Sequence, residues 1–520
     1  MPTYKMLVNG ALVAGAGAYG VINPATGEAF AEAPVADRAI VDRSLDAALA
    51  AFPSWSALSF EVRAGLMLKW ADAIEARFPD FARLLTLEQG KPLDQASYEM
   101  GGTIACLRYY AAQRVGDKVL RQDDTSRIIE HRRPLGVVAA ITPWNFPMIL
   151  LMIKIGPALI TGNTVIAKPA PTTPLTTLLL GETAAGILPP GVFQTLVTGN
   201  DLAGMLTSDP RIAYVSFTGS TPTGKRVYAA GADTLKRFTL ELGGNDAAIV
   251  LDDADVETVA AGIYGAATMN AGQVCMAAKR VYAPRALYGP LCEALGQLAD
   301  QAIVGDGLEQ GTQIGPIQNL PQFQKLVGFH NEAAAKGRIV GGKGILERKG
   351  YFVHPTIVAD LPDGARLVRE EQFGPILPVL AYDDLESALH RANDSIYGLA
   401  GTVWTSDPAR GEAIARRMVT GTVWVNKHMD VPFDIPFGGA KQSGIGRQQG
   451  EEGLHDFTQA SVVNVNLAAM GPARRTAAAA ATKSAPAVSS PAPDRSKLES
   501  VGASGDGRRK SLIARLFTRS

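Results

Sequence analysis

One cysteine and one glutamate stand out as side chains that could carry out covalent chemistry. Cys275 ends the segment Gly272-Gln273-Val274-Cys275, and Glu241 lies in an apolar run directly before two glycines. A cysteine supplies a soft nucleophile, and a carboxylate in apolar surroundings is costly to desolvate. Taken alone, Cys275 also fits a buried structural cysteine, because unpaired cysteines are among the residues most often buried.

Two further polar motifs follow short apolar runs. In Pro143-Trp144-Asn145-Phe146-Pro147, prolines and aromatic residues hold an asparagine amide that could donate to a developing oxyanion. The same residues also suit a rigid turn. Lys168-Pro169 places an ammonium at the end of the next run, where a ribose or a phosphate could bind, although a solvated lysine at a strand end has the same pattern.

Two loops add glycines and hydrogen-bond acceptors. Residues 217–224 resemble a loop from a strand into a helix, in which glycines allow close backbone approach and the helix N-terminus favours an anion. The spacing is not the G-x-G-x-x-G fingerprint. In Glu370-Glu371-Gln372-Phe373-Gly374-Pro375, acceptors and an aromatic ring precede a Gly-Pro turn, and by pattern alone this segment is a loop.

The elements that must position these motifs change in character near Gly136. Before it the pattern predicts short strands and amphipathic helices, and after it short apolar runs alternate with helical segments. Strands that are apolar on both faces and alternate with helices predict an α/β fold with a doubly wound parallel sheet, in which ligands bind beyond the carboxyl ends of the strands. The predicted helices are 37–51, two within 60–89, and 95–115; the predicted strands are 127–132, 137–141, 164–167, 192–197, 214–217, 247–251, 279–283, 378–381, 422–426 and 457–467.

These six motifs, taken in their order along the chain, resemble the aldehyde dehydrogenase superfamily, hydrolytic type, over about residues 5–467. The resemblance implies the aldehyde dehydrogenase fold: a Rossmann-like, doubly wound cofactor-binding domain (1–119 and 135–243), an α/β catalytic domain (244–442) and a small bridging β-sheet of oligomerisation strands (120–134 and 455–470). It also implies a homodimer or homotetramer, because an edge strand of this bridging sheet needs a partner strand.

The same resemblance implies roles for individual residues. Cys275 would attack an aldehyde, Asn145 and the Cys275 backbone N–H would hold the oxyanion, and Glu241 would activate water to hydrolyse the thioester. Lys154 is implied near the glutamate, where it would assist proton exit. These roles suit a soft thiolate and a partly desolvated carboxylate. The implied cofactor is NAD or NADP, with Lys168 at the adenosine ribose and Glu371 at the nicotinamide ribose. The implied cofactor-binding residues are Trp144, Lys168, Phe217, Gly219, Ser220, Gly224, Leu242, Glu371 and Phe373.

Two residues depart from the family pattern. Pro171 stands where many NAD-dependent members carry a ribose-binding glutamate, which leaves NADP open as well as NAD. Gln448 stands where a glutamate of a proposed proton relay is common, and a glutamine cannot titrate. Two alternatives remain: a coenzyme A-acylating enzyme, against which Glu241 argues, and an inactive member acting as a binding protein, against which Cys275, Glu241 and Asn145 argue.

The composition narrows the class of protein. The chain has 520 residues with 50 basic and 50 acidic side chains, which gives no electrostatic case for a nucleic-acid partner. Three cysteines, an odd and sparse count, argue against a disulfide framework and for a reducing compartment. Because no metal-ligand spacing, signal peptide or membrane-length apolar run is evident, we expect no metal site, no membrane span and a cytoplasmic protein.

The sequence does not identify the aldehyde. Val274 and Met276 flank the nucleophile and indicate a mostly aliphatic tunnel. The loop 427–434 is implied at the mouth of this tunnel. Its two carboxylates would suit an amino-aldehyde, although solvated acidic residues are usual in a surface loop.

Residues 471–520 lie outside the resemblance and carry ten basic and three acidic side chains. Residues 471–507 are rich in Ala, Ser, Pro and Gly, which predicts a flexible linker. Residues 508–520 predict a short amphipathic helix that resembles the encapsulation peptides of bacterial microcompartments, so a shell protein is an expected partner. An unstructured basic tail and a helix lying on an anionic membrane are the alternatives. The predicted apolar face consists of Leu512, Ile513, Leu516 and Phe517.

Overall fold

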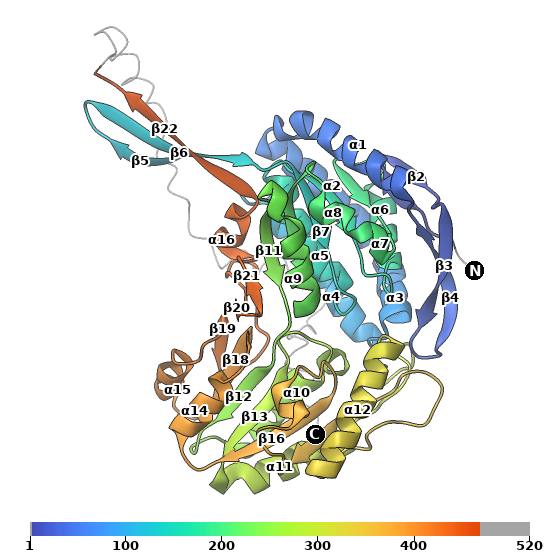
Figure 1. Cartoon of the computed structure of the whole chain (residues 1–520), viewed down its shortest axis with the longest axis vertical. Helices are drawn as coiled ribbons and strands as arrows, with labels where there is room; N and C mark the ends of the chain where they lie inside the picture. Colours follow the sequence, from blue (N-terminus) through green and yellow to red (C-terminus); the bar gives the residue numbers. More distant parts are fainter. Residues whose placement is uncertain (1–2, 469–520) are drawn as a thin grey trace, which may run out of the picture. The chain divides into compact units, whose positions relative to one another are not determined.

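The computed structural model describes residues 3–468, and Figure 1 shows the order of their helices and strands. These residues form two compact units. One comprises the chain up to Val115 together with Arg133–Gln459, and the other comprises Gly116–Arg132 and the chain from Ala460. The predicted linker at 471–507 and the predicted terminal helix at 508–520 lie outside the described residues.

The first unit begins with short strands and four helices, as the sequence pattern predicts. Asp37 caps α1 by accepting a hydrogen bond from the Ile40 amide at 2.8 Å, which satisfies one of the free amides of the first helical turn. Helix α3 ends at Gly90, whose φ of 99° costs little for a glycine. The bounds are β1 Met6–Val8, β2 Ala11–Val13, β3 Gly17–Asn23, β4 Glu28–Val35, α1 Arg38–Ser56, α2 Phe60–Ala76, α3 Phe78–Gln89 and α4 Leu93–Ala111.

A six-stranded sheet in the order β21-β11-β10-β7-β8-β9 places several polar motifs along one edge. Its strands are parallel apart from β21. Glu241 pairs in register with Thr218, and Lys168 pairs with Ile141, so these strand ends lie on the same side, where ligands bind in such sheets. The bounds are β7 Val137–Ile141, α5 Pro147–Ile160, β8 Thr164–Lys168, α6 Leu175–Ala184, β9 Phe193–Thr195, α7 Asn200–Ala203, α8 Met205–Ser208, β10 Ile212–Thr218, α9 Thr221–Ala230, β11 Arg237–Glu241 and β21 Gly444–Ile445.

A seven-stranded sheet in the order β14-β15-β16-β13-β12-β18-β19 follows in the chain, and its strands are parallel apart from β14. The 3-10 helix η2 leads into the nucleophile segment. The bounds are β12 Asp246–Val250, α10 Val256–Thr268, η2 Met269–Gly272, β13 Ala278–Pro284, α11 Arg285–Asp300, α12 Leu320–Lys336, β14 Arg338–Gly341, β15 Thr356–Ala359, α13 Arg366–Arg369, β16 Ile376–Tyr382, α14 Leu385–Asn393, β17 Tyr397–Gly398, β18 Ala400–Trp404, α15 Pro408–Ala415, β19 Thr422–Val425, β20 Ala440–Lys441 and α16 Gly450–His455.

The predicted α/β fold is confirmed, with two refinements. Each large sheet ends in one antiparallel strand, β21 or β14, at an edge where a strand needs no crossover helix. The sequence pattern also misses β11, β15 and β18. β11 and β18 are as long as the predicted β7 and β8, but their sequences RFTLE and AGTVW are less continuously apolar, so the pattern does not separate them from the neighbouring segments.

The second unit contains strands of a three-stranded sheet in the order β22-β6-β5. The extended segments predicted at 127–132 and 457–467 correspond to β6 (Ser126–Pro134) and β22 (Thr458–Asn466), and β5 (Lys118–Gln122) pairs antiparallel with β6. The exposed apolar residues of this three-stranded sheet include Val119, Leu120, Val462 and Val463.

Across residues 3–468, no helix combines the length and the apolar character needed to cross a membrane.

Candidate active site

A strained turn presents the predicted nucleophile. Asn270, Ala271 and Gly272 have φ values of 52°, 54° and 69°, three left-handed residues in succession. A Cβ at Gly272 would lie 2.5 Å from the Gly374 backbone, so only glycine fits there. Cys275 follows this turn and is half-buried. Burial raises the pKa of the Cys275 thiol to about 12, and the positive charge of Lys279 opposes this rise.

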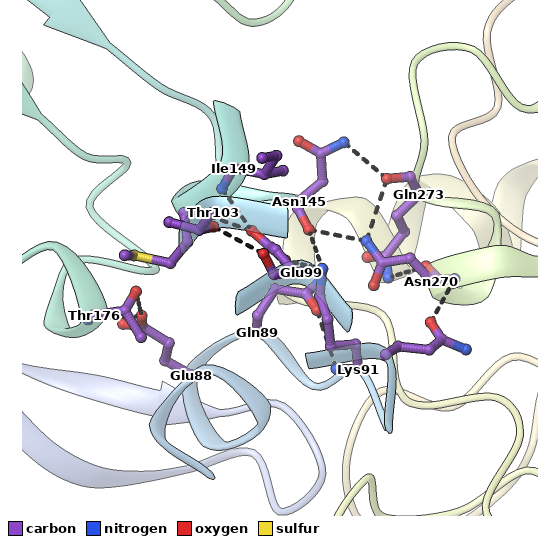
Figure 2. A network of polar contacts seen from close by, with 12 residues as sticks. Glu88, Gln89, Lys91, Glu99, Thr103, Asn145, Ile149, Thr176, Asn270 and Gln273 are labelled. Atoms are coloured by element: carbon purple, nitrogen blue, oxygen red, sulfur yellow. Dashed lines mark hydrogen bonds and ion pairs between the residues drawn. The ribbon is translucent and has the colours of Figure 1, made fainter. Parts of the chain in front are cut away.

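The amide of Asn145 lies against the same turn (Figure 2). Asn145 follows β7 and is 2 % exposed, and its Nδ2 donates to the Gln273 carbonyl at 2.9 Å. A side-chain amide carries two N–H groups, so the second one is available to an oxyanion formed at Cys275. The structure therefore brings the predicted oxyanion donor to the predicted nucleophile segment.

Glu241 is the last residue of β11 and is buried. Neither carboxylate oxygen accepts a hydrogen bond within the described part of the chain. Burial raises the pKa of Glu241 to about 8, and the charges of Lys154 and Arg447 oppose this rise. The Glu241 charge also acts on Cys275, which shows that the two groups are within electrostatic range of each other. A carboxylate of this kind can act as a general base near neutral pH.

Lys154 is fully buried in α5 and faces the same region. Its Nζ donates to the Thr218 hydroxyl at 2.7 Å. Burial lowers the pKa of Lys154 to about 7, while the charges of Glu241 and Cys275 oppose this fall. Lys154 can therefore exchange a proton with its surroundings near neutral pH.

The residues expected at the cofactor pack against one another in pairs. A Cβ at Gly224 would lie 2.4 Å from the Leu242 side chain, and a Cβ at Gly219 would lie 2.5 Å from the Phe217 ring. The rings of Trp144 and Phe373 meet edge to face, with centroids 5.3 Å apart. Ser220 caps α9 by accepting from the Thr223 amide.

Lys168 provides a test of whether these residues fit a dinucleotide. Its side chain is 6 % exposed, and its Nζ makes one long hydrogen bond, 3.4 Å to the Pro169 carbonyl. An ammonium has three donors, so this one has capacity for ribose hydroxyls or a phosphate. Burial lowers the pKa of Lys168 to about 8. Together with the close glycine contacts, these properties fit NAD or NADP.

Lys279 is a site residue that the sequence patterns miss. This lysine is 1 % exposed, lies four residues after Cys275 in β13, and its Nζ donates to the Cys275 carbonyl. The same Nζ lies 3.4 Å from Glu371 Oε1, which also accepts from the Gly244 amide at 3.0 Å. A lysine directly after the apolar start of a buried strand is the signal that could have identified it, because lysine is rarely buried without a partner.

Pro171 and Gln448, the two residues that depart from the family pattern, have different surroundings. Pro171 is exposed, and its carbonyl accepts from the Tyr19 hydroxyl at 2.6 Å. Gln448 is buried and its Nε2 lies 3.5 Å from the Ser216 hydroxyl. In the loop 427–434, Asp430 and Lys427 form an exposed ion pair at 2.6 Å, so this carboxylate already has a partner. Residues 3–468 contain no cluster of His, Cys, Asp or Glu suited to a metal ion.

Comparison with known proteins places this geometry in a family. Residues 13–463 match the aldehyde dehydrogenase family. The chain is 37 % identical over 455 residues to the NADP(+) succinate-semialdehyde dehydrogenase of Escherichia coli, covering 86 % of this chain and 94 % of that protein. It is 36 % identical over 460 residues to a betaine aldehyde dehydrogenase of Rhizobium etli, covering 85 % and 93 %. The NAD+ complex of an aldehyde dehydrogenase from Bacillus cereus superposes with a TM-score of 0.87 at 34 % identity, covering 90 % of this chain and 97 % of that one. The chain belongs to the aldehyde dehydrogenase family and is an NAD(P)-dependent oxidoreductase.

Proposed function

We propose that this enzyme oxidises an aldehyde to a free carboxylic acid through a thioester on Cys275. The Cys275 thiol releases its proton to solvent as its sulfur forms a bond to the aldehyde carbon, and the oxygen becomes an oxyanion held by Asn145 and the Cys275 amide. Bound NAD(P)+ supplies the hydride acceptor. Loss of hydride leaves a thioester, which water attacks after giving a proton to Glu241, and the acid leaves as the sulfur is released.

The observation that carries the hydrolytic step is the state of Glu241. Its carboxylate is buried, has no hydrogen-bond partner within the described residues, and lies within electrostatic range of Cys275. Such a group is costly unless it acts on a bound water or substrate. The second candidate is transfer of the acyl group to coenzyme A. It is less favoured because that reaction does not need a base to activate water.

The experiment supplies an aldehyde panel with NAD+ or NADP+ in the absence of coenzyme A. We expect NAD(P)H and free acid in equal amounts from the wild type and neither product from Cys275→Ala. Cys106→Ala and Cys292→Ala, which replace buried cysteines in separate parts of the hydrophobic core, are matched controls that should retain activity. NAD(P)H formation only after coenzyme A is added would favour the acylating enzyme, and no turnover by the wild type would favour the inactive binding protein.

The proposal includes the roles of the two α/β regions and the preference for NAD or NADP. Residues 1–119 and 135–243 would bind the cofactor, and residues 244–442 would carry the catalytic cysteine. Lys168 and Glu371 would hold the two riboses, and Phe373 would back the nicotinamide. Pro171 removes a carboxylate that would repel a 2′-phosphate, so we propose that the enzyme accepts both NAD and NADP. The ratio of kcat/KM for the two cofactors tests this point.

We also propose a homodimer or homotetramer built on strands within 120–134 and 455–470. Unpaired strand edges favour pairing with another chain, and the exposed valines of β22 support this use of the sheet. The three free cysteines of the described chain suit a reducing compartment such as the cytoplasm.

The tail supports a proposal of microcompartment targeting through residues 508–520. The sequence places a linker before a short amphipathic segment, and a shell would confine a reactive aldehyde. The test fuses residues 471–520 to a fluorescent protein and expresses the fusion with and without shell proteins. We expect foci only when shell proteins are present, and their loss in a Leu512→Asp, Leu516→Asp variant. Diffuse fluorescence in both cases, or recruitment of that variant, would refute the targeting role.

A further inference from the structure

Two oppositely charged side chains lie in the core behind the main chain of Asn145 (Figure 2). Lys91 Nζ and Glu99 Oε2 are 2.6 Å apart, and neither side chain is exposed. Lys91 follows the glycine that ends α3, and Glu99 lies in α4. The reaction steps proposed above use neither residue.

Lys91 holds the backbone of the oxyanion donor. Its Nζ donates to the Asn145 carbonyl at 2.9 Å and lies 3.6 Å from the centre of the Phe146 ring. The same carbonyl accepts from Asn270 Nδ2 at 3.0 Å. The main chain of Asn145 is therefore fixed both to the buried pair and to the strained turn before Cys275.

Glu99 holds the next turn of the chain. Its Oε1 accepts from the amides of Met148 and Ile149 at 2.9 and 3.2 Å. These amides belong to the first turn of α5, where backbone N–H groups have no partner within the helix. The pair thus fixes the chain at Asn145 and immediately after it.

A fully buried ion pair is a poor device for stability alone, because the loss of hydration on burial offsets much of the attraction between the charges. An apolar pair would fill the same space, but it would not offer directed hydrogen bonds to the Asn145 segment. We infer that Lys91 and Glu99 are positioning residues that hold Asn145 where its amide meets the oxyanion at Cys275. The inference rests on the proposed function, since it requires Asn145 to be an oxyanion donor.

A double-mutant cycle tests this inference on the full-length enzyme. Lys91→Met combined with Glu99→Gln removes both charges and leaves no lone buried charge. The measured quantity is the rate constant of NAD(P)H formation in the first turnover. We expect a fall of about 10- to 100-fold for the pair variant and of about 10²- to 10³-fold for Asn145→Ala. If the pair acts through Asn145, adding its substitutions to Asn145→Ala should cost no more than about a further two-fold.

Glu88 supplies a matched control in the same region. It is also a fully buried glutamate, and it accepts from the amides of Leu175 and Thr176 at 2.7 and 2.9 Å, at the start of α6. Glu88→Gln should lower the melting temperature while the first-turnover rate stays within about two-fold of wild type. The rate at which iodoacetamide alkylates Cys275 should be the same in the pair variant as in the wild type, because Lys91 and Glu99 do not contact the nucleophile.

Several results would overturn the inference. The first is that the Lys91 and Glu99 substitutions slow the first turnover as much in the Asn145→Ala background as in the wild type. The second is that Glu88→Gln slows the first turnover as much as the pair variant does. The third is that the pair variant loses Cys275 alkylation in parallel with its first-turnover rate. A wild-type rate in Asn145→Ala would overturn both the oxyanion role and the inference, whereas a slow Asn145→Ala with an additive cycle overturns the inference alone. If the pair variant does not fold, the cycle is run with Lys91→Arg, for which the same dependence on Asn145 is expected.

Discussion

The chemistry of Cys275 depends on burial and on the ammonium of Lys279. Since the pKa of the thiol is raised to about 12, its alkylation by iodoacetamide in the cofactor-free enzyme should accelerate about ten-fold per pH unit from pH 7 to 10 without a plateau. Lys279→Met removes the positive charge that opposes this rise and should slow alkylation at pH 8 by about ten-fold, equivalent to one pKa unit.

Lys325→Met is the control for this change. Lys325 Nζ donates to the Glu371 carbonyl at 2.8 Å, so it contacts the same loop without contacting the Cys275 segment, and its loss should leave alkylation unchanged. Equal effects of the two substitutions would show that loop disturbance, and not the Lys279 charge, governs the thiol.

Glu241 should reduce stability at alkaline pH. Its folded-state pKa of about 8 exceeds the ordinary value of 4.5, so the folded protein holds the extra proton. The resulting stabilisation is complete below pH 4.5 and is lost as the pH rises through 8. Glu241→Gln cannot ionise and should raise the free energy of unfolding at pH 9 by about 2–4 kcal/mol, with little change near pH 5. Thermal unfolding at pH 5 and pH 9 measures the difference in free energy of unfolding between Glu241→Gln and the wild type. The same difference at both pH values would argue against a buried, titrating carboxylate.

At the scale of elements, the close packing of α9 against the residue after Glu241 predicts a cost for any side chain at Gly224. Gly224→Ala would bring its Cβ within 2.4 Å of Leu242. We expect a destabilisation of about 1–3 kcal/mol and a raised KM for NAD(P)+. Gly328→Ala in α12 has open space and should instead stabilise by about 0.5–1 kcal/mol. Thermal unfolding and cofactor titration compare the two, and similar results would contradict the packing argument.

The sequence predicts the elements that obey strong local rules. The Asp37 cap, the helices before residue 112 and the strands that end in Lys168 and Thr218 all appear near their expected positions. Strands such as β11 are missed because tertiary pairing, and not local pattern, makes them strands. The motifs indicate Asn145, Glu241 and Cys275, but not the residues behind them. Lys91, Glu99 and Lys279 are found through burial and contacts across distant segments, which spacing along the chain does not encode.

At the scale of the whole molecule, the exposed apolar residues of β22 predict association. Light scattering at micromolar concentration should show a dimer or tetramer, and Val462→Asp should shift the population toward monomer. Ile303→Asp changes an exposed apolar residue of the first unit, 54 % accessible against 61 % for Val462, and should leave the assembly intact. A monomeric wild type would contradict the proposed oligomer.

The proposed roles of Cys275 and Glu241 are tested by a rapid-quench experiment on Glu241→Gln with aldehyde and NAD(P)+. In the proposed mechanism, formation of the thioester needs Cys275 and Asn145, whereas its hydrolysis needs the Glu241 carboxylate. We predict a burst of one NAD(P)H per active site, a steady-state rate lower by about 10²- to 10⁴-fold, and an acyl adduct on Cys275 detectable by mass spectrometry. A wild-type steady-state rate, or an adduct on any other residue, would contradict the assignment of nucleophile and base.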